Sequence, residues 1–558
     1  MHSKNLWYVT LIVLLIALTA GLTQAQDDAT IQLSGGPGDP QSIDPQQGIN
    51  MRDWYLLNLL FPGLVSLDEE SNQLEPGFVS SWEVSEDGLT TTFHLLEGIP
   101  WVRYNAETGE VEQVMDDMGN PRIVTAHDVV YGFRRALHPE TGTFSAFMLA
   151  PLVAGGEAFN AGESDGSDLG VQAIDDFTFS VTAPISVGYA LPLYSLMSAR
   201  PSPAWAIEEF GNRWIEPENI QTFGPYALKD WVHEDSMTFV RNPHWPGSDG
   251  YAQARAAEIV FRFLDQGVSL REYEAGNLDT VSVPTDQIPR LKADPELSQE
   301  LTLSPGACSF VLGFHTNKAP FDNVHIRRAF SYAIDRELFV DTVLQGAGIP
   351  ARWITPPSIY LAPTPETDPD VGIAYDPMKA DEELAAGLDS LGLASVDELP
   401  PITVYFRDSE NENTRAQFFQ VVWEDELGIR VELAPQDVTT YWSRAIEDAG
   451  PIHFAGWCPD YNDANNFLRD QYLSGGQYNY GKYASAAFDD LVNAAQAESD
   501  ADTRRELYRQ AENQIVVDDA AIVPISWGVV PTLTKPNLTR TFVPSSLQAF
   551  WKWEKTSE

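Results

Sequence analysis

The stretch Phe454-Ala455-Gly456-Trp457-Cys458-Pro459-Asp460-Tyr461-Asn462-Asp463 is the most informative part of the chain. It places a glycine, a large aromatic side chain, a cysteine and an acid within five residues. If Cys458 is in a disulfide, the backbone is fixed there. Asp460 then becomes a fixed anion beside an aromatic wall, which suits an ammonium group. The same acid could instead cap a turn or the helix expected near Asn465. The local sequence leaves these two roles open.

The chain has only two cysteines, Cys308 and Cys458. In an oxidising compartment, two distant cysteines most simply form one disulfide. That bond would close a loop of 458 − 308 = 150 positions, which the chain-entropy description values at roughly 5 kcal/mol. Two free, buried thiols are the alternative.

The N-terminal segment indicates export. Lys4 lies in a weakly positive region, the apolar run Leu6–Ala20 follows, and Thr23-Gln24-Ala25 has the small-x-small pattern of a cleavage site. The apolar run of about 15 residues is short for a membrane-spanning helix, which needs roughly 20. We expect residues 1–25 to be a signal peptide that sends the mature chain to the periplasm or cell exterior. No cysteine lies near the cleavage site to carry a lipid, and an uncleaved signal anchor is the alternative.

Composition excludes several classes of partner. The 558 residues include 81 Asp+Glu against 34 Lys+Arg, a formal net charge of −47, while 43% of residues are hydrophobic. These values are typical of a globular protein of two or three domains. Because so negative a field repels phosphate backbones and anionic headgroups, we expect no nucleic-acid partner. The acids are interpreted as a solvated surface, set either by habitat or by a preference for basic ligands.

The whole chain predicts a mixed α/β protein with large lobes. Helices are expected at Thr414–Leu427, Ala484–Ala497 and Asp502–Val517, and two others after the caps Thr125 and Asn323. Strands are expected in segments rich in aromatic and β-branched residues, namely Thr91–Leu95, Phe177–Thr182, Met237–Arg241, Glu258–Phe263, Phe310–His315, Ile402–Phe406 and Arg430–Leu433.

Turn residues mark the loops. Ser34–Pro40 and Ala362–Pro369 are the clearest of them, and Tyr104–Pro121 is interpreted as an inserted hairpin. The acids at 163, 165 and 168 do not have the spacing of a calcium-binding EF-hand loop and are interpreted as a solvated loop.

The usual catalytic signatures are missing from the sequence. There is no Gly-x-Ser-x-Gly, no His-Glu-x-x-His and no phosphate-binding glycine loop, and the nine histidines lack metal spacing. We therefore expect no cofactor, no metal and no enzymatic activity. Aromatic residues in loops stand out instead. They could bury a ligand, although most are expected to pack in the core: Trp54, Tyr55, Trp101, Trp353, Trp442, Trp457, Tyr461, Tyr478 and Tyr480.

An ordered set of motifs resembles the family 5 extracellular solute-binding proteins of ABC importers, of the oligopeptide- and dipeptide-binding type. The resemblance runs from about Ile31 to about Pro536 and rests on Gln41–Pro45, Leu60–Leu64, Ser81–Gly88, Thr92–Leu95, Val124–Tyr131, Asp168–Val171, Ala173–Asp176, Gly224–Trp231, Gly456–Asn462 and Ile522–Pro524. One such motif would be weak evidence, but ten in the family's order make the resemblance specific.

The resemblance implies a periplasmic-binding-protein-like α/β fold. Two large lobes would be joined by a two-strand hinge near Ala307 and Trp527, with an extra smaller domain and a ligand cleft between the lobes. The implied limits are residues 26–61, 204–307 and 528–558 for domain I, 62–203 for domain II with an insertion at about 104–121, and 308–527 for domain III.

The resemblance also implies roles for single residues. Asp460 would pair with the α-ammonium of a peptide, and Gly456, Trp457 and Cys458 would form a strand whose backbone pairs with it. Strand addition of this kind reads no side chain, so selectivity would be broad. Ile49, Asn50 and Met51 would form the opposite strand, and Cys308 and Cys458 match a disulfide of part of the family.

The sequence departs from the family where the far end of a peptide would bind. Phe454 stands where some members carry an arginine that meets the peptide carboxylate. No histidine lies near Asn411 or Glu412, and Gly313 replaces an acid. The carboxyl-end anchor and the preferred peptide length are therefore left open.

The expected function is a monomeric binding protein that captures short peptides and presents them to ABC permease subunits. Alternatives on the same fold bind dipeptides, oligosaccharides, nickel chelates or haem, and the acid at 460 speaks against the last three. A secreted hydrolase is the alternative from another class. Turnover of labelled peptides would distinguish a hydrolase from a binding protein.

Overall fold

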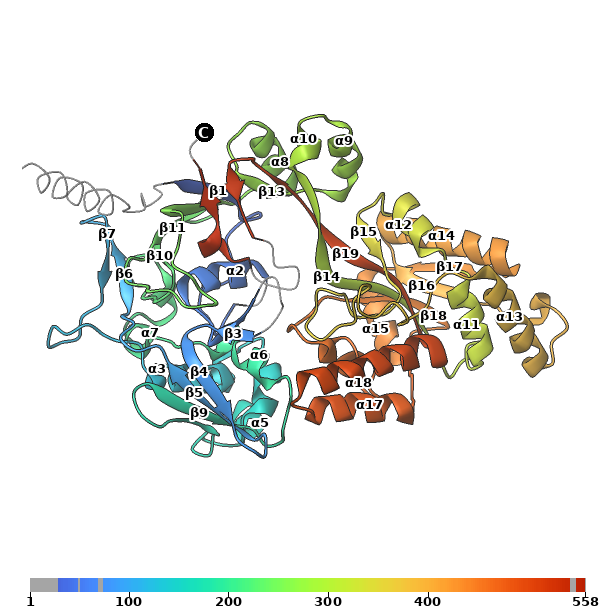
Figure 1. Cartoon of the computed structure of the whole chain (residues 1–558), viewed down its shortest axis with the longest axis horizontal. Coiled ribbons are helices and arrows are strands. Elements are labelled where there is room, and N and C mark those ends of the chain that lie inside the picture. The colour runs from blue at the N-terminus through green and yellow to red at the C-terminus, as the bar shows by residue number, and fades with distance from the viewer. Residues whose placement is uncertain (1–28, 49–50, 69–73, 542–547, 557–558) are drawn as a thin grey trace, which may run out of the picture.

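The computed structural model describes residues 29–48, 51–68, 74–541 and 548–556, so the expected signal peptide lies outside the described residues. None of the helices in these ranges is long and apolar enough to cross a membrane. The chain forms two lobes connected by two long strands (Figure 1). We call the lobe that holds β1 and β10 to β13 lobe 1, and the lobe that holds β16 to β18 lobe 2.

One large sheet runs through both lobes. Its strand order is β10-β11-β12-β1-β13-β19-β14-β18-β16-β17, with β15 paired to β19 at the side. The strands are β1 (Thr30–Ser34), β10 (Tyr226–Val232), β11 (Ser236–Arg241), β12 (Glu258–Arg262), β13 (Thr280–Ser282), β14 (Leu301–Phe314), β15 (Gly348–Pro350), β16 (Thr403–Arg407), β17 (Glu432–Gln436), β18 (Ile452–Trp457) and β19 (Ile522–Thr534).

The two connecting strands are β14 and β19, which cross between the lobes in Figure 1. They pair antiparallel from Leu301↔Leu533 to Gly313↔Ile522, and the register shifts between Pro305 and Ser309. An irregularity in the ladder weakens the sheet locally and lets it bend. This break lies beside the crossings near Ala307 and Trp527 that the resemblance implies for a hinge, and the position of the hinge stays a prediction.

Lobe 1 carries a second, four-stranded sheet in the order β4-β5-β9-β8. Its residues Phe93 and Phe179 belong to the same hydrophobic cluster as Ile31 and Phe239 of the large sheet. The smaller sheet therefore shares the core of lobe 1. The elements of this region are α2 (Met51–Leu60), β2 (Val65–Leu67), β3 (Leu74–Pro76), β4 (Val79–Val84), β5 (Thr90–Leu95), β6 (Val102–Asn105), β7 (Glu110–Gln113), α3 (Ala126–Leu137), α4 (Ala146–Leu149), α5 (Gly156–Asn160), β8 (Val171–Ala173), β9 (Thr178–Thr182), α6 (Ala190–Tyr194) and α7 (Ala204–Phe210).

Lobe 2 has a separate hydrophobic core on each face of its sheet. Leu312 and Phe454 pack with helices α11 to α14 on one face, and Val311 packs with α17 and α18 on the other.

The remaining α-helices and strands of the two lobes are α8 (Gln266–Glu274), α9 (Ile288–Ala293), α10 (Leu297–Glu300), α11 (Val324–Tyr332), α12 (Arg336–Thr342), α13 (Pro377–Leu391), α14 (Glu410–Leu427), α15 (Val438–Asp448), α16 (Arg469–Tyr472), α17 (Ala486–Ala497), α18 (Ala501–Asn513), β20 (Leu538–Thr539) and β21 (Glu554–Lys555).

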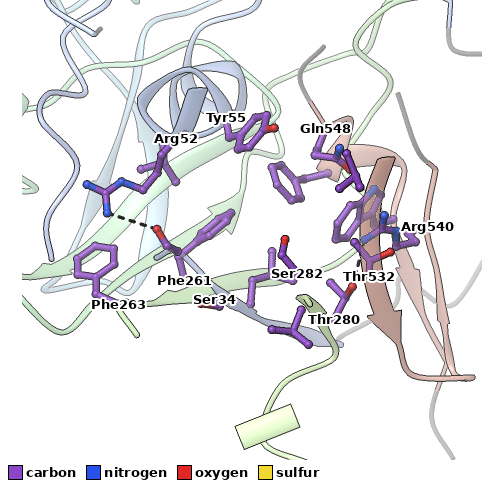
Figure 2. A pocket seen from close by; sticks show the side chains of 17 residues that line it. Ser34, Arg52, Tyr55, Phe261, Phe263, Thr280, Ser282, Thr532, Arg540 and Gln548 are labelled. Carbon is purple, nitrogen blue, oxygen red and sulfur yellow. Dashed lines mark hydrogen bonds between the residues drawn. The ribbon is translucent and has the colours of Figure 1, made fainter. Parts of the chain in front are cut away.

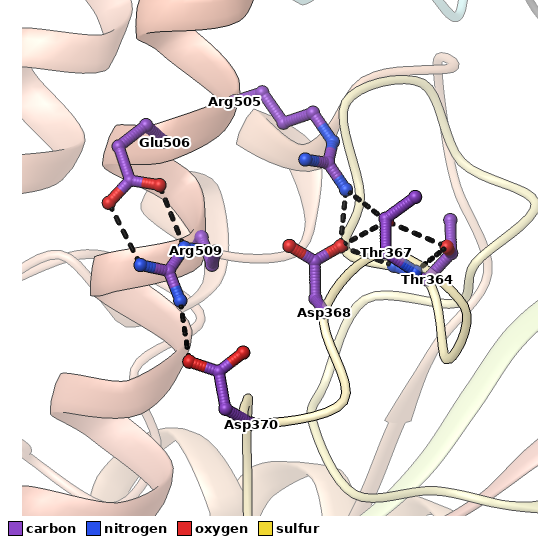
Figure 3. A network of polar contacts seen from close by, with 7 residues as sticks. All are labelled: Thr364, Thr367, Asp368, Asp370, Arg505, Glu506 and Arg509. Atoms are coloured by element: carbon purple, nitrogen blue, oxygen red, sulfur yellow. Dashed lines mark hydrogen bonds and ion pairs between the residues drawn. The ribbon is translucent and has the colours of Figure 1, made fainter.

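The predicted loop Ala362–Pro369 is fastened to α18 by a polar network (Figure 3). Arg505 pairs with Asp368, which also accepts hydrogen bonds from the Thr367 hydroxyl (2.6 Å) and the Thr364 amide (3.0 Å). Burial opposes ionisation of Asp368, but these hydrogen bonds and the charge of Arg505 outweigh it and lower its pKa. The ionised form is therefore part of what holds this loop.

The predicted elements are present. Each of the seven expected strands coincides with a strand, six of them to within three residues at each end, whereas the strand expected at Phe310–His315 is β14, which begins at Leu301. The three expected later helices are present as α14, α17 and α18, to within four residues at the ends. Asn323 caps α11 through bonds from two backbone amides, and Thr125 forms a capping box with Asp128. The predicted hairpin is the antiparallel pair β6–β7.

Candidate functional site

The site lies at the C-terminal end of strand β18. Strand β18 pairs with β14 along its whole length, but β16 pairs with it only at Ile452 and His453. The hydroxyl of Tyr441 donates to the carbonyl of Phe454. Among the described strands, none pairs with the edge formed by Ala455, Gly456 and Trp457 on the β16 side. An open strand edge of this kind can accept an added strand.

Two features fix the end of β18. Gly456 is exposed, and a Cβ built on it would lie 2.6 Å from the carbonyl oxygen of Ser309, so only glycine fits this close pairing of β14 and β18. Directly after the strand, Cys458 is bonded to Cys308. The predicted disulfide is therefore confirmed, and it joins the site to the part of β14 where the register with β19 shifts.

Asn466 positions Asp460 and Trp457 together. Its Oδ1 accepts hydrogen bonds from the Trp457 indole (2.8 Å) and the Asp460 amide (2.9 Å). Its Nδ2 donates to Asp460 Oδ2 and to Asp470 Oδ2, both at 3.2 Å. Because Asn466 is 2% exposed, this arrangement is held rigidly.

Electrostatics make the site favourable for a cation. Burial raises the pKa of Asp460, the hydrogen bond from Asn466 opposes this, and the neighbouring charge of Asp470 adds to the rise. Burial also raises the pKa of Asp470, despite hydrogen bonds from Tyr461 and Asn466. An ammonium group in contact with both acids would relieve the cost of keeping two partly buried carboxylates ionised.

The alternative role for Asp460, capping a turn or helix, belongs instead to Asp463. Asp463 is buried and accepts a hydrogen bond from the Asn465 amide (2.9 Å) at the start of the short helix Ala464–Asn466. It also pairs with Arg504 of α18 and accepts from the Tyr508 hydroxyl (3.1 Å). The carboxylate of Asp460 is thus left to face the cavity.

A cavity of about 370 Å³ lies at Asp460 between the lobes. Lobe 2 contributes Trp457, Tyr461 and Tyr478 to its wall, and lobe 1 contributes Phe147 and Tyr189. The rings of Tyr189 and Tyr461 stack with centroids 5.5 Å apart. The Gly188 amide also donates to the Gln496 carbonyl (2.8 Å). The volume and aromatic lining are those of a pocket for a small organic ligand.

Aromatic side chains continue from this cavity along lobe 2. Trp457 lies against Tyr478 with centroids 5.2 Å apart, and Trp442 of α15 lies 6.1 Å from Tyr480. Trp442 is 42% exposed. Of the aromatic residues singled out in the sequence, Trp457, Tyr461 and Tyr478 line the cavity, while Trp101 and Trp353 are fully buried core residues.

The residues predicted to form the opposite strand do not take that form in the described part. Ile49 and Asn50 lie outside the described residues, and Met51 is the first residue of helix α2. The expected strand is therefore wrong for Met51, because the segment that follows Asn50 is helical. Its role as a ligand contact stays a prediction.

Lobe 1 has a second cavity of about 210 Å³ beside α2 (Figure 2). Arg52 and Tyr55 of α2, Ser282 of β13 and Arg540 lie around it. Arg540 donates to the Thr280 hydroxyl (3.1 Å), and Arg52 donates to backbone carbonyls such as that of Pro37 (2.8 Å). Both guanidinium groups thus help to hold the surface of lobe 1 in place.

Sequence reasoning missed Asn466, Asp470 and Tyr189. Asn466 and Asp470 follow the recognised motif within ten residues, but nothing in their spacing shows that Asn466 bonds to both Asp460 and Asp470. Tyr189 comes from lobe 1, so only the tertiary fold places it against Tyr461. Within the described residues, no group of three or more His, Cys, Asp or Glu side chains is placed to hold a metal ion.

Comparison with known proteins identifies relatives of the chain. Residues 73–479 match the family described as bacterial extracellular solute-binding proteins, family 5. The chain is 30% identical over 546 residues to the periplasmic oligopeptide-binding protein OppA of Salmonella typhimurium, covering 96% of this chain and 95% of OppA.

Two solved structures show the same fold. The unliganded open form of the murein tripeptide-binding protein MppA has a TM-score of 0.81 at 24% identity, covering 95% of this chain and 98% of MppA. Haemophilus influenzae OppA in complex with the peptide RPPGFSPFR has a TM-score of 0.64 at 28% identity, covering 95% of this chain and 99% of that one.

Proposed function

We propose, because the chain belongs to family 5 of the bacterial extracellular solute-binding proteins, that it captures short oligopeptides outside the cytoplasmic membrane and delivers them to an ABC permease. The observation that carries this proposal is the open edge of β18, which leads directly to a partly buried carboxylate, Asp460, in an aromatic cavity. The open edge offers main-chain hydrogen-bonding groups to the backbone of a peptide. The carboxylate at its end offers a negative charge to the α-ammonium group of the same peptide.

The chemistry of the site favours recognition of the peptide's backbone over recognition of particular peptide side chains. An added strand would pair with Ala455, Gly456 and Trp457 through main-chain groups, which every peptide has. The α-ammonium group would bind Asp460, with Asp470 adding negative charge nearby. Side chains would meet the aromatic surface of Trp442, Tyr478 and Tyr480, which favours no single residue type.

Closure of the lobes would enclose the ligand. Bending at the break between Pro305 and Ser309 would bring lobe 1 toward β18, and the ligand would stabilise the closed state by contacting both lobes. Ile49, Asn50 and Met51 are the contacts we expect from lobe 1. The higher TM-score to an open, unliganded form than to a peptide complex supports an open arrangement of this structure.

The proposed protein is a monomer that binds without catalysis and resides in the periplasm or cell exterior. The domain limits are those implied by the sequence, and the proposed hinge between the lobes is the register shift between Pro305 and Ser309, with its second crossing at Trp527, which pairs with Ser309.

Purified protein incubated with labelled di- to hexapeptides tests the proposal. We expect binding of one peptide per protein, recovery of the peptide unchanged, and no product over hours. Accumulation of cleaved peptide would contradict the proposal in favour of a hydrolase. No binding of any peptide would contradict the peptide class itself.

A further inference from the structure

Strands β14 and β19 connect the two lobes, and a loop of lobe 1 touches lobe 2 at a second place. This loop, residues 183–189, runs between β9 and α6 and lies against the end of α17 and the turn to α18 (Figure 1). The Gly188 amide donates to the Gln496 carbonyl (2.8 Å), and Gln496 Nε2 donates to the Tyr189 hydroxyl (3.4 Å). We call this contact between the loop and lobe 2 the side contact.

The side contact is part of the hydrophobic core of lobe 1. Tyr461 belongs to lobe 2, yet it packs in the same cluster as Val187, Tyr189 and Leu193 of lobe 1. The rings of Tyr189 and Tyr461 stack with centroids 5.5 Å apart, and each residue is only 8% exposed. Because separation of the lobes here would expose both rings to water, the packing favours a contact that persists when the lobes move.

The two backbones approach each other closely at Gly188. A Cβ built on Gly188 would lie 2.1 Å from the Glu498 carbonyl oxygen and 2.8 Å from Arg504 Nη1, so any side chain would push the loop away from lobe 2. Arg504 is itself held in place, since its side chain is 4% exposed and pairs with the fully buried Asp463. The surface of lobe 2 beneath the loop is therefore firmly held.

Hydrogen bonds connect the side contact to Asp460. The Tyr461 hydroxyl donates to Asp470 Oδ2 (2.6 Å), and Asn466 Nδ2 donates to both Asp470 and Asp460. Tyr189 thus fixes a ring whose hydroxyl belongs to the network that holds the Asp460 carboxylate. Tyr189 and Asp460 also line the same cavity.

We propose that Gly188 and Tyr189 are positioning residues: the side contact stays closed while the lobes move, acts as a second pivot beside the hinge strands, and keeps the pocket at Asp460 assembled before a peptide arrives. This inference rests on the proposed function, because it assumes that the lobes close around a peptide whose α-ammonium group binds Asp460. A rigid lobe that is held at two places rotates about the line that joins them, and atoms next to that line move least.

A pivot at this place determines the order of events in binding. Asp460 lies next to the side contact, so its pocket would have nearly the same shape in the open and the closed protein. A ligand that meets an assembled pocket does not have to supply the free energy of assembling it. A peptide would therefore bind first by its amino end, and the parts of the cleft farther from the pivot would close on it afterwards.

Spin labels on the two sides of the side contact test the proposal without altering Gly188 or Tyr189. Ile185→Cys places one label on the loop, where Ile185 is 55% exposed, and Ser499→Cys places the other on the exposed turn of lobe 2. Cys308 and Cys458 are bonded to each other, so only the introduced thiols react. Dipolar broadening in electron paramagnetic resonance reports whether the labels are close, and the radius of gyration from small-angle X-ray scattering reports lobe closure.

We expect dipolar broadening in the free protein and the same broadening after saturation with Ala-Ala-Ala, while the radius of gyration falls. Broadening that is absent from the free protein, or that disappears on binding, would overturn the proposal, because the side contact would not be a pivot. An unchanged radius of gyration with bound peptide would also overturn it, since no rotation would occur. These results leave the proposed function intact, whereas failure of every peptide to bind would contradict both.

Gly188→Ala tests the positioning role. The clash with Glu498 should separate the side contact, remove the broadening, and weaken the affinity for Ala-Ala-Ala by about 10-fold if the assembled pocket falls to about a tenth of the molecules. The loss should be smaller for N-acetyl-Ala-Ala-Ala, which has no ammonium group for Asp460. Equal weakening of both ligands would indicate a merely structural effect and contradict the positioning role, as would an unchanged affinity for Ala-Ala-Ala.

Gly267→Ala is the matched control. Gly267 is another glycine of lobe 1, on α8, and the nearest heavy atom to its added Cβ lies 3.8 Å away. This variant should keep the broadening and the affinity of the wild type, and a loss equal to that in Gly188→Ala would contradict a specific role for Gly188. The label experiment keeps Gly188 and Tyr189 unchanged, so a folding defect in Gly188→Ala cannot hide the answer.

Discussion

Replacement of Asp460 by asparagine tests the amino-end anchor. The variant keeps the size and the hydrogen-bonding oxygen that Asn466 contacts, and it removes only the negative charge. In the structure the Asp460 carboxylate accepts one side-chain hydrogen bond, from Asn466 Nδ2 at 3.2 Å. An arriving ammonium group would therefore be the main partner of this charge.

The expected loss follows from the partial burial of Asp460. A hydrogen bond to a charged group contributes about 1.5–3 kcal/mol, and breaking a fully buried ion pair costs about 3–5 kcal/mol. Since Asp460 is only partly buried, we expect a loss of about 2–3 kcal/mol, which is roughly a 30- to 150-fold weaker affinity for Ala-Ala-Ala. Calorimetry measures this directly.

A double-mutant cycle makes the test specific. N-acetyl-Ala-Ala-Ala should bind the wild type about as weakly as Ala-Ala-Ala binds Asp460→Asn, and acetylation should have little further effect on the variant. Asp490→Asn, a change at an exposed acid of α17, serves as the control and should bind like the wild type. An acetylation cost that persists unchanged in Asp460→Asn would refute the assignment of the ammonium group to Asp460.

Three other outcomes follow from the same geometry. Replacing Cys308 and Cys458 by serine should lower the free energy of unfolding by about 2–5 kcal/mol in denaturant titration, and an unchanged midpoint would contradict a stabilising role for the bond. Gly456→Ala should lower thermal stability and peptide affinity, because the added Cβ would lie 2.6 Å from a carbonyl oxygen. Gly267→Ala on α8 is the control and should lower neither, because the nearest heavy atom to its added Cβ lies 3.8 Å away. The pKa of Asp460 is raised, so its carboxylate becomes protonated at a higher pH than that of an ordinary aspartate. Peptide affinity should therefore rise with pH through that pKa. An affinity that does not change between about pH 3 and pH 7 would contradict this role of Asp460.

The elements of the fold could be predicted where local signals were strong. The segments with alternating apolar residues, such as Thr91–Leu95, are strands, and Asn323 caps the helix that follows it. The hinge position that the resemblance implies stays a prediction. The 14-residue length of β14 could not be predicted, because its first half, with Pro305 and Gly306, lacks a strand pattern and is held in place by pairing with β19.

The disulfide was predictable from the sequence, and the ligand-binding role of Asp460 stays a prediction. The residues that support Asp460 were not predictable. The sequence could not decide which acid caps the helix near Asn465, because Asp460 and Asp463 both precede it closely. The structure assigns the cap to Asp463, which accepts a hydrogen bond from the Asn465 amide. An ion pair with Arg504, 41 positions away, also holds Asp463 in place.

A crystal structure of the protein with Ala-Ala-Ala tests the central claim most directly. We predict closed lobes, the tripeptide paired with the main chain of Ala455, Gly456 and Trp457, and its amino nitrogen about 2.8 Å from a carboxylate oxygen of Asp460. A tripeptide bound in the reverse direction, or at a site away from the β18 edge, would contradict the account.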